Sequence, residues 1–184
     1  SHILDLVRAN FQNTFWNARA GYLADYVDNA GQRLEVRPNM LYALVGEDIP
    51  VEPEVAQRVL QVIDNELVTR RGIRTLSPRH PEYKGVYEGS QTDRDLAYYN
   101  GCCLPFLLGP YCEVCFKMKG PAFLNKAQWL VNGFYEDLNK HGVGAFSELY
   151  DGDPPHEPHG AISSALSTAA LLEVEYLKDK YKEK

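Results

Sequence analysis

The chain has 184 residues, of which 45% are hydrophobic and 11% aromatic, and its formal net charge is −6 at pH 7. This size suits one domain with a substantial core. Broad binding to a nucleic-acid backbone requires a basic face, and a membrane span requires roughly 20 apolar residues in a row. Neither is present in the sequence. We therefore expect a single domain over residues 1–184, with neither nucleic acid nor a membrane as partner.

The start of the chain and its cysteines bear on its compartment. Ser1 and His2 are interpreted as a tag remnant, and a helical pattern follows directly, with no signal peptide. The cysteines all lie in one apolar stretch and are interpreted as buried small hydrophobic residues: Cys102, Cys103, Cys112 and Cys115. Cys112 and Cys115 have metal or redox spacing, but no second pair completes a zinc site. A cytoplasmic location is the simplest expectation.

Helical periodicity dominates the first third of the chain. Residues 3–16 are amphipathic. Pro38 opens an apolar segment that runs to Val45, since proline is favoured at the first position of a helix. Residues 53–67 place their apolar side chains on one face. We predict helices over these three segments.

Three further helices are predicted in the second half. Residues 104–118 are apolar over most of the circumference, which is typical of a buried helix. Residues 121–140 are amphipathic, residues 161–177 are rich in Ala, Leu and Ile, and residues 178–184 form a charged tail that we expect to be solvated. Exposed and buried helices thus alternate three times. The pattern predicts an all-α fold of three helical hairpins, about half of an α/α toroid or (α/α)6 barrel, which usually has about six pairs.

Two long connecting segments carry most of the polar and aromatic residues. Residues 70–102 and 141–160 are dense in Gly, Pro, Tyr, Arg, Asp and His. Loops longer than about 15 residues in a compact domain are usually functional or disordered, and this aromatic content argues against disorder. Both segments lead into predicted inner helices. We expect them to converge at one end of the ring and to form a pocket there.

Several motifs in these segments resemble, in order, those of the amylo-α-1,6-glucosidase domain of glycogen debranching enzymes. Residues 37–41, Arg-Pro-Asn-Met-Leu, are similar to the Arg-Pro-Asn-Gln-Leu motif of that family. Residues 72–78, Gly-Ile-Arg-Thr-Leu-Ser-Pro, resemble its Gly-Leu-Arg-Thr-Leu-Ser-Pro. Residues 94–98, 107–111 and 147–156 continue the match. The resemblance implies an (α/α)6 barrel, hydrolysis of α-1,6 branch points in glycogen-like glucans, and glucose release with inversion. It implies an α-glucan or branched malto-oligosaccharide as partner and no cofactor.

The chain departs from the family pattern at two places. The family usually has His-Gln-Gly-Thr-Val-Trp-Pro-Trp where residues 99–106 read Tyr-Asn-Gly-Cys-Cys-Leu-Pro-Phe. Leu104 cannot replace an indole that stacks on a sugar and donates a hydrogen bond, which puts the choice of substrate in question. The family's general acid lies in a Trp-Met-Asp segment well upstream, and this sequence contains no such segment. We expect the acid to lie on a missing upstream segment and this chain alone to be inactive.

Glu148 is the predicted general base. Glycoside hydrolysis uses two carboxyl groups, and inverting enzymes hold them roughly 6.5–9.5 Å apart to leave room for water. Glu148 lies in a glycine-rich loop between Phe146 and Tyr150, where partial desolvation can tune the pKa of a carboxyl group. The resemblance to the final active-site loop of the family carries this assignment.

The predicted sugar-binding residues are polar or aromatic and come from the same segments. Sugar hydroxyls need donors and acceptors in fixed geometry, and sugar C–H faces pack on aromatic rings. The set is Arg37, Asn39, Arg74, Tyr87, Asp95, Tyr99, Asn100, Asp151 and His156, with Tyr83 and Tyr98 as further aromatic candidates. Arg37 and Asn39 equally suit a structural helix entry. Arg94 and Asp95 are expected to form a buried pair that supports the long loop, with a structural role for Arg94 and with Asp95 still open as a ligand of sugar hydroxyls.

A cluster of acidic residues and histidines follows Glu148. Asp151, Asp153, His156 and His159 include mixed oxygen and nitrogen ligands, but three prolines interrupt them without matching a known metal-ligand spacing. We expect no metal. The prolines instead favour a rigid loop that positions Glu148, in which Asp151 or Asp153 can also bind sugar hydroxyls.

Two alternatives and one physical consequence accompany this prediction. The chain could be a carbohydrate-binding fragment without catalysis, or part of a related α/α-toroid glycosidase with another oligosaccharide substrate. An upstream segment like Trp-Met-Asp would distinguish the first alternative, and product analysis the second. In half a ring, the edges of the inner helices expose apolar surface. We therefore expect self-association through these edges.

Overall fold

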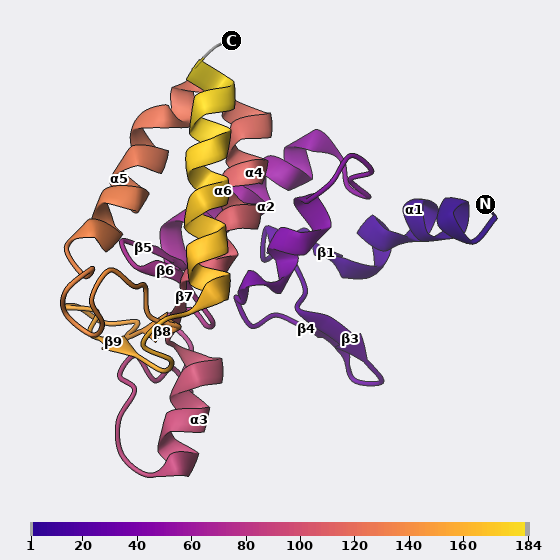
Figure 1. The fold of residues 1–184 in the computed structure, drawn as a ribbon. Helices are drawn as coiled ribbons and strands as arrows, with labels where there is room; N and C mark the ends of the chain where they lie inside the picture. The colour runs from indigo at the N-terminus through magenta and orange to yellow at the C-terminus, as the bar shows by residue number, and fades with distance from the viewer. Residues whose placement is uncertain (1, 183–184) are drawn as a thin grey trace.

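The computed structural model describes residues 2–182, which form six α-helices, three 3-10 helices and nine short strands (Figure 1). Ser1 of the expected tag remnant, and Glu183 and Lys184 of the expected charged tail, lie outside the described residues.

The α-helices are α1 (His2–Phe15), α2 (Pro53–Glu66), α3 (Gln91–Asn100), α4 (Leu108–Lys119), α5 (Leu124–Tyr135) and α6 (Ala165–Lys182). The 3-10 helices are η1 (Pro38–Leu44), η2 (Pro105–Leu107) and η3 (Gly120–Phe123). Two hairpins are formed by β1 (Trp16–Asn17) with β2 (Tyr22–Leu23), and by β3 (Tyr26–Asp28) with β4 (Gly31–Arg33). The remaining strands are β5 (Val68–Thr69), β6 (Gly72–Arg74), β7 (Cys103–Leu104), β8 (Leu149–Tyr150) and β9 (Pro158–His159).

The last five strands form one antiparallel sheet in the order β5-β6-β7-β8-β9, so the prediction of an all-α fold is wrong. Each of these strands has only two or three residues, too few for a period of two to appear in the sequence. Ile73 pairs with Leu104, and Cys103 pairs with Tyr150. Gly72 has a φ of 128°, and a Cβ atom at this residue would lie 2.8 Å from the Leu104 backbone. Glycine is therefore required where β6 approaches β7.

Most of the predicted helices are present with shifted ends. The helix predicted over 53–67 is confirmed as α2, whereas residues 38–44 form the 3-10 helix η1. The buried helix predicted over 104–118 is divided into β7, η2 and α4, and the helix predicted over 121–140 ends at Tyr135. The segment 70–102, expected to be irregular, contains α3.

The final helix corrects the expectation of a solvated tail only in part, since Asp179, Lys180 and Lys182 are exposed and Lys178 is buried. α6 begins at Ala165 and continues to Lys182. The Lys178 side chain is only 3% exposed, and its Nζ lies 2.7 Å from Glu175 one turn earlier. The charge run is therefore largely helical, and its first lysine is buried as part of an ion pair, which lowers the cost of removing it from water.

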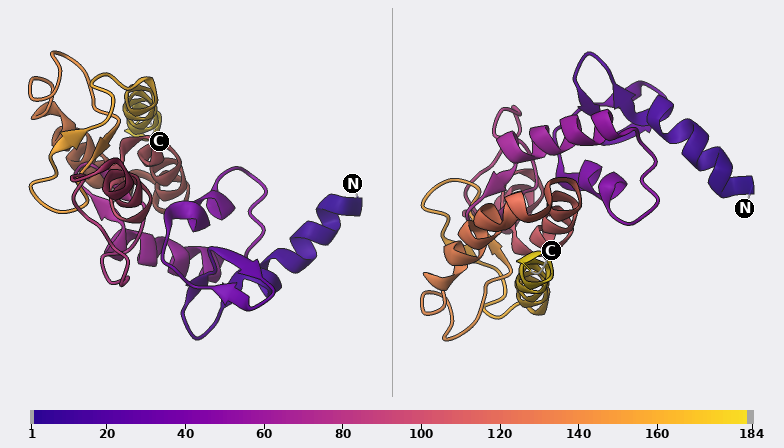
Figure 2. Two further views of the ribbon diagram at one scale, coloured as in Figure 1. Left: turned by 90° about the horizontal axis from the view of Figure 1, so that it is seen from below. Right: turned by 90° about the horizontal axis from the view of Figure 1, so that it is seen from above.

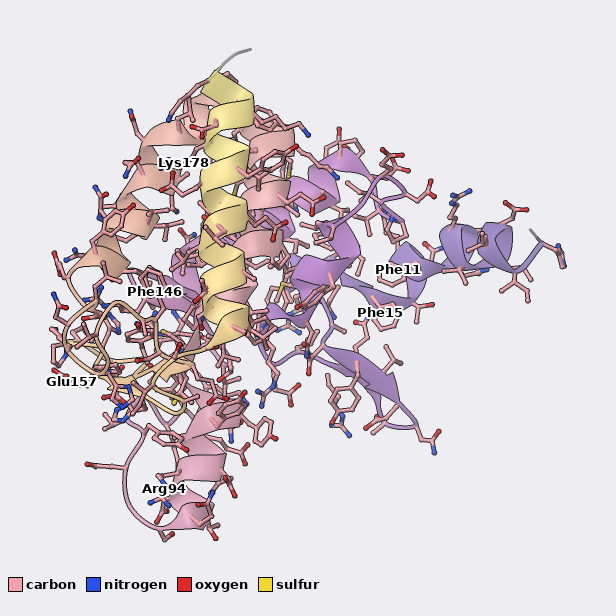
Figure 3. The ribbon with its side chains drawn as sticks, viewed as in Figure 1. Phe11, Phe15, Arg94, Phe146, Glu157 and Lys178 are labelled. Carbon is pink, nitrogen blue, oxygen red and sulfur yellow. The ribbon has the colours of Figure 1, made fainter. Side chains whose placement is uncertain are left out.

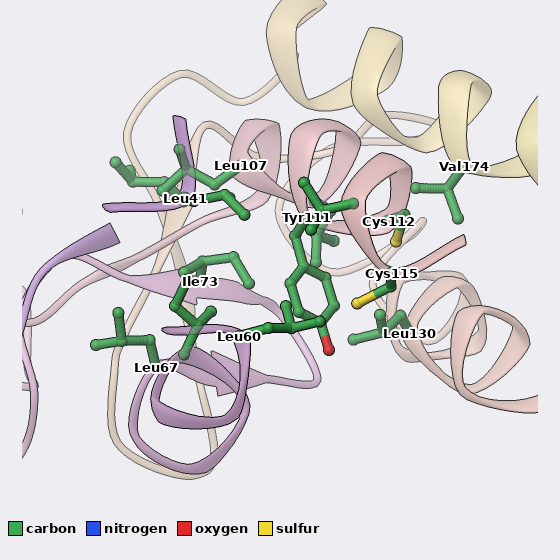
Figure 4. Packing of buried hydrophobic residues seen from close by; sticks show 14 of the residues in the cluster. Leu41, Leu60, Leu67, Ile73, Leu107, Tyr111, Cys112, Cys115, Leu130 and Val174 are labelled. Carbon is green, nitrogen blue, oxygen red and sulfur yellow. The ribbon is translucent and has the colours of Figure 1, made fainter. Parts of the chain in front are cut away.

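The core is centred on α4, which packs against α6 and η1. Tyr111, Phe116 and Leu108 on α4 are fully buried. Figure 4 shows the Tyr111 ring among Leu60, Ile73 and Leu130. The helix is apolar on nearly all sides because it has neighbours on nearly all sides, as its sequence predicted.

The four cysteines are buried and free, as expected. Burial raises the pKa of Cys102, Cys103 and Cys115 to about 12 and the pKa of Cys112 well above its ordinary value. The thiolate is the reactive form of cysteine, so these residues are packing residues.

Helix α1 extends away from the rest of the molecule in every view (Figures 1 and 2), and none of its residues is buried. Ile3, Leu4, Leu6 and Val7 are between 49% and 72% exposed. An ion pair of 2.7 Å between Arg8 and Asp48 connects α1 to the segment before α2. Much exposed apolar surface thus lies on α1, and self-association stays a prediction. No helix within residues 2–182 has the length and apolar character needed to cross a membrane.

Candidate active site

Glu148 lies directly before β8, at the end of the long α5–β8 connection. Its backbone N–H donates to the Ala161 carbonyl (3.0 Å), and its Oε2 accepts from the Ala161 N–H (2.9 Å). The side chain is half-buried, and no group among residues 2–182 donates a hydrogen bond to Oε1. Glu148 therefore presents a carboxylate with one oxygen fixed and the other available to a ligand or water.

The charge of this carboxylate acts on one tyrosine, Tyr98. Burial, and secondarily the negative charge of Glu148, raise the pKa of Tyr98, with smaller contributions from Tyr99 and Tyr87. The Tyr98 and Tyr99 rings meet edge to face at 5.2 Å, and Tyr99 is 65% exposed. A half-buried carboxylate coupled to Tyr98, whose ring contacts the exposed ring of Tyr99, suits a neutral polar ligand with C–H faces, such as a sugar.

The Asp151 carboxylate holds together the hairpin that follows Glu148. Asp151 Oδ1 accepts from the Tyr87 N–H (2.7 Å) and lies 2.9 Å from His159 Nε2. His156 Nδ1 donates to the Asp151 carbonyl (2.8 Å), and the Tyr87 and His159 rings lie 5.3 Å apart. Asp151, Tyr87 and His156, all predicted site residues, are thus brought together, with contacts that shape the loop.

The neighbouring Asp153 is engaged in the same way. Its Oδ1 accepts from the Tyr83 hydroxyl (2.9 Å), and burial together with this bond raises the pKa of Tyr83. No three His, Cys, Asp or Glu side chains in the described part of the chain are grouped as metal ligands.

Glycines allow three segments to touch through their backbones behind this hairpin. A Cβ atom at Gly101 would overlap the Lys84 carbonyl, and one at Gly152 would overlap the Gly101 carbonyl. Arg74 joins the same layer, since its Nε donates to Gly152 O (3.0 Å) and its Nη1 to Glu66 O (3.3 Å) at the end of α2. Arg74 therefore connects α2 to the loop that follows Glu148.

Arg37 connects a second set of distant segments. Its Nη1 donates to Thr75 O (3.1 Å) and Tyr99 O (2.6 Å), and its Nη2 donates to Asn100 Oδ1 (2.8 Å). Its Nε lies 3.8 Å from Asp25 Oδ2. The guanidinium thus fixes the end of α3, which carries Tyr99 and Asn100, relative to the start of η1.

Asn39 is held by an acidic residue that the sequence did not single out. Its Nδ2 donates to Asp25 Oδ1 (2.7 Å), so the amide oxygen faces away from this bond. Both residues line a cavity of about 470 Å³, whose walls include Phe11 and Phe15 at the inner end of α1 (Figure 3). Glu148 is not among its lining residues. Asp25 lies directly before β3, and no motif in the sequence marks it.

The expected buried pair of Arg94 and Asp95 is wrong. Arg94, on the outlying helix α3 in Figure 3, donates to Gly89 O (2.7 Å) and Gln91 Oε1 (3.0 Å). Asp95 is exposed and accepts from Gln91 Nε2 (2.7 Å). The N-terminus of α3 is instead fixed by a capping box of Ser90 and Asp93. Asp95 thus shares α3 with Tyr99 but takes no part in the contacts around Glu148.

Comparison with solved structures places this architecture among known folds. The chain is similar to neutral trehalase from Saccharomyces cerevisiae, with a TM-score of 0.66 and 13% identity. The match covers 96% of this chain and 30% of that chain, so this chain spans less than a third of the length of the trehalase. At this identity the likeness concerns the fold alone. The fold of this chain, helices and small antiparallel sheet together, is therefore similar to part of the fold of that trehalase.

Comparison with sequences gives the family. No curated protein matches the chain. Residues 1–173 match the family model described as amylo-alpha-1,6-glucosidase, which covers nearly the whole sequence. The chain therefore belongs to the amylo-alpha-1,6-glucosidase family, a family of glycoside hydrolases.

Proposed function

We propose that this chain is part of a glycoside hydrolase that cleaves α-1,6-glucosidic branch points of glycogen-like glucans and releases glucose with inversion. Glu148 is the general base and removes a proton from the attacking water. The observation that carries the proposal is the geometry of Glu148: Oε2 is fixed by Ala161 while Oε1 has no protein donor among the described residues. A carboxylate held at one oxygen and free at the other can orient water and accept its proton.

The general acid is proposed to come from outside these 184 residues. The next two acidic residues along the chain, Asp151 and Asp153, are both engaged in holding their loop. In an inverting site the acid stands roughly 6.5–9.5 Å from the base, across the scissile bond. It protonates the leaving oxygen while water attacks the anomeric carbon from the opposite face.

The proposed sugar contacts divide into two groups. The first group can contact the sugar directly. The exposed ring of Tyr99 can pack on a C–H face. The amide oxygen of Asn39 and the amide nitrogen of Asn100 can bond to hydroxyls, because the other polar atom of each amide is already bonded within the protein. The other proposed residues act mainly by shaping the walls around the sugar: Arg37, Arg74, Tyr87, Asp151 and His156. Asp95 is the most peripheral member of the set because it lies exposed on α3.

A carbohydrate-binding protein without catalysis is the second candidate. Leu104 stands where the family usually has tryptophan, and it is buried in β7 at 6% exposure. It therefore lacks both the ring and the donor of an indole. The same change suits a related glycosidase with a different oligosaccharide substrate, which product analysis would identify.

The test uses the full-length protein that contains this chain and a branched α-1,6 oligosaccharide, with glucose release as readout. Glu148→Gln keeps the size of the side chain but removes the base, and we expect turnover to fall about 10³-fold or more. Glu157→Gln is the matched control, because Glu157 lies exposed on the same loop (Figure 3). Sugar binding without glucose release by the wild type would favour the second candidate. Full activity of Glu148→Gln would refute Glu148 as the base.

A further inference from the structure

The residue directly before Glu148 is fixed by three different parts of the molecule. Ser147 is 2% exposed, and its Oγ lies 2.8 Å from His141 Nδ1 in the α5–β8 connection. Its carbonyl accepts from Ser167 Oγ (2.8 Å) on α6. Its N–H donates to the Tyr150 hydroxyl on β8 at a longer distance, 3.4 Å.

These contacts hold the peptide that leads into Glu148. The Ser147 carbonyl belongs to the peptide group whose N–H is that of Glu148, and that N–H donates to Ala161 O (3.0 Å). Both polar atoms of this peptide are therefore bonded, one to α6 and one to the segment after β9. Because the peptide is planar, its orientation limits the directions that the Glu148 side chain can take.

The bond between Ser147 and His141 does not require one protonation state. A hydroxyl can donate to a neutral imidazole nitrogen, and it can accept from a protonated one. If the histidine partner is lost, a buried hydroxyl is left without a partner, and this costs free energy unless the loop moves to satisfy it. Loss of the histidine partner therefore either destabilises this segment or favours a shift of the loop next to Glu148.

We propose that Ser147 and His141 are positioning residues for Glu148. They act through the backbone of Glu148, without contacting the sugar or the attacking water. The inference rests on the proposed function, since it assigns them the task of keeping the general base within hydrogen-bond reach of the attacking water. A misplacement of the order of 1 Å in such a site can cost about 10²-fold in rate.

The first experiment compares Ser147→Ala with wild type in the full-length protein, using α-glucosyl fluoride. Fluoride leaves without protonation by an acid. Water attacks the anomeric carbon, the C–F bond breaks, and the base takes the proton of the water, so the rate reports on the base. We expect kcat to fall about 10- to 100-fold with KM within about twofold of wild type. Ser77→Ala is the matched control: Ser77 is also 2% exposed, but its Oγ donates to Glu66. We expect its kcat to be that of wild type.

A double-mutant cycle distinguishes positioning from a general loss of structure. If Ser147 acts only through Glu148, Ser147→Ala has no further effect in the Glu148→Gln background. An equal fold-loss in both backgrounds overturns the inference. Wild-type kcat for Ser147→Ala, together with the expected large loss of turnover in Glu148→Gln, also overturns the inference but leaves the proposed function standing. Full activity of Glu148→Gln refutes the proposed function itself. If Ser147→Ala does not fold, His141→Ala, at the half-exposed end of the same bond, goes through the same cycle.

Discussion

Glu148 and Ala161 exchange two hydrogen bonds: the Glu148 N–H donates to Ala161 O, and the Ala161 N–H donates to Glu148 Oε2. The first bond fixes the backbone of the glutamate and the second fixes its carboxylate. The position of the Glu148 carboxylate therefore depends on the short segment between β9 and α6, and in particular on Gly160.

Gly160→Ala is expected to reduce both stability and turnover. Gly160 has φ +71°, and a Cβ atom there would lie 2.7 Å from Glu148 Oε2 and 3.0 Å from a Leu149 methyl carbon. Gly144→Ala is the matched control, because Gly144 has φ +67° and a Cβ atom there would have no neighbour within 4 Å. Both variants should lose roughly 1–2 kcal/mol from backbone strain alone. Only Gly160→Ala should also lower kcat. Chemical denaturation measures the loss of stability in both variants, and glucose release measures the turnover. Equal turnover in the two variants would contradict the role of the close contact.

The pKa of Tyr98 should fall when Glu148 is changed to Gln. Burial is the main cause of the raised pKa and the Glu148 charge is the next. Removing a nearby negative charge makes it easier to ionise the phenol, so the pKa should decrease yet stay above the ordinary tyrosine value. Carbon-13 NMR of ring-labelled tyrosine, assigned with Tyr98→Phe, gives the measurement. The same pKa in Glu148→Gln and wild type would show that the two side chains are not electrostatically coupled.

His156 should make the fold less stable as pH falls below the ordinary pKa of histidine. Burial lowers the pKa of His156 from 6.5, and its bond to the Asp151 carbonyl opposes this only in part. The unfolded chain therefore binds a proton more readily than the folded one. The stability due to the neutral ring is complete above about pH 6.5 and is lost as pH falls through the folded pKa. His156→Asn keeps a donor and tolerates the φ of 64°. Its free energy of unfolding, measured by urea denaturation, should depend less steeply on pH between about 5 and 6.5.

Arg71 and Asp137 should be among the most sensitive positions for stability. Their side chains are 5% and 2% exposed, and Arg71 Nε lies 3.0 Å from Asp137 Oδ2. Breaking a buried pair leaves a buried charge, at a cost of about 3–5 kcal/mol. Lys140 Nζ lies 3.3 Å from Asp137 Oδ1 and partly compensates the Asp137 charge when Arg71 is removed, so we expect a loss near the lower end of this range. Urea denaturation of Arg71→Ala measures this loss. The matched change Arg33→Ala, in the exposed pair with Asp28, should shift the denaturation midpoint little.

The parts of the fold that could be predicted are those with a long helical period. The apolar stripe of α2 and the all-round apolar surface of α4 are both visible in the sequence, and both helices formed. The sequence of α3 lacks such a stripe because only Ala97 on it is buried, yet its capping residues Ser90 and Asp93 were a usable signal. The strands of the sheet were missed because pairing between distant segments creates them.

The sequence named candidate site residues but gave little information about their contacts. The positions of Glu148, Asp151 and Arg37 in the motifs made them candidates. The resemblance could not show that the Arg37 guanidinium donates its hydrogen bonds to backbone and side-chain acceptors of the protein. Asp25 and Ser147 were missed because their importance comes from their partners, Asn39 and His141. Such partners become visible only when the chain has brought them together.

The contacts of Arg37 also have a consequence for the order in which the molecule assembles. This one side chain bonds residues 38, 62 and 63 positions further along the chain. Contacts between such distant residues form only after the intervening chain has closed a large loop, which is entropically costly. The end of α3, which carries Tyr99, should therefore become ordered late during folding. In partial unfolding it should open before the α4 core, and the amides at the end of α3 should exchange with solvent first.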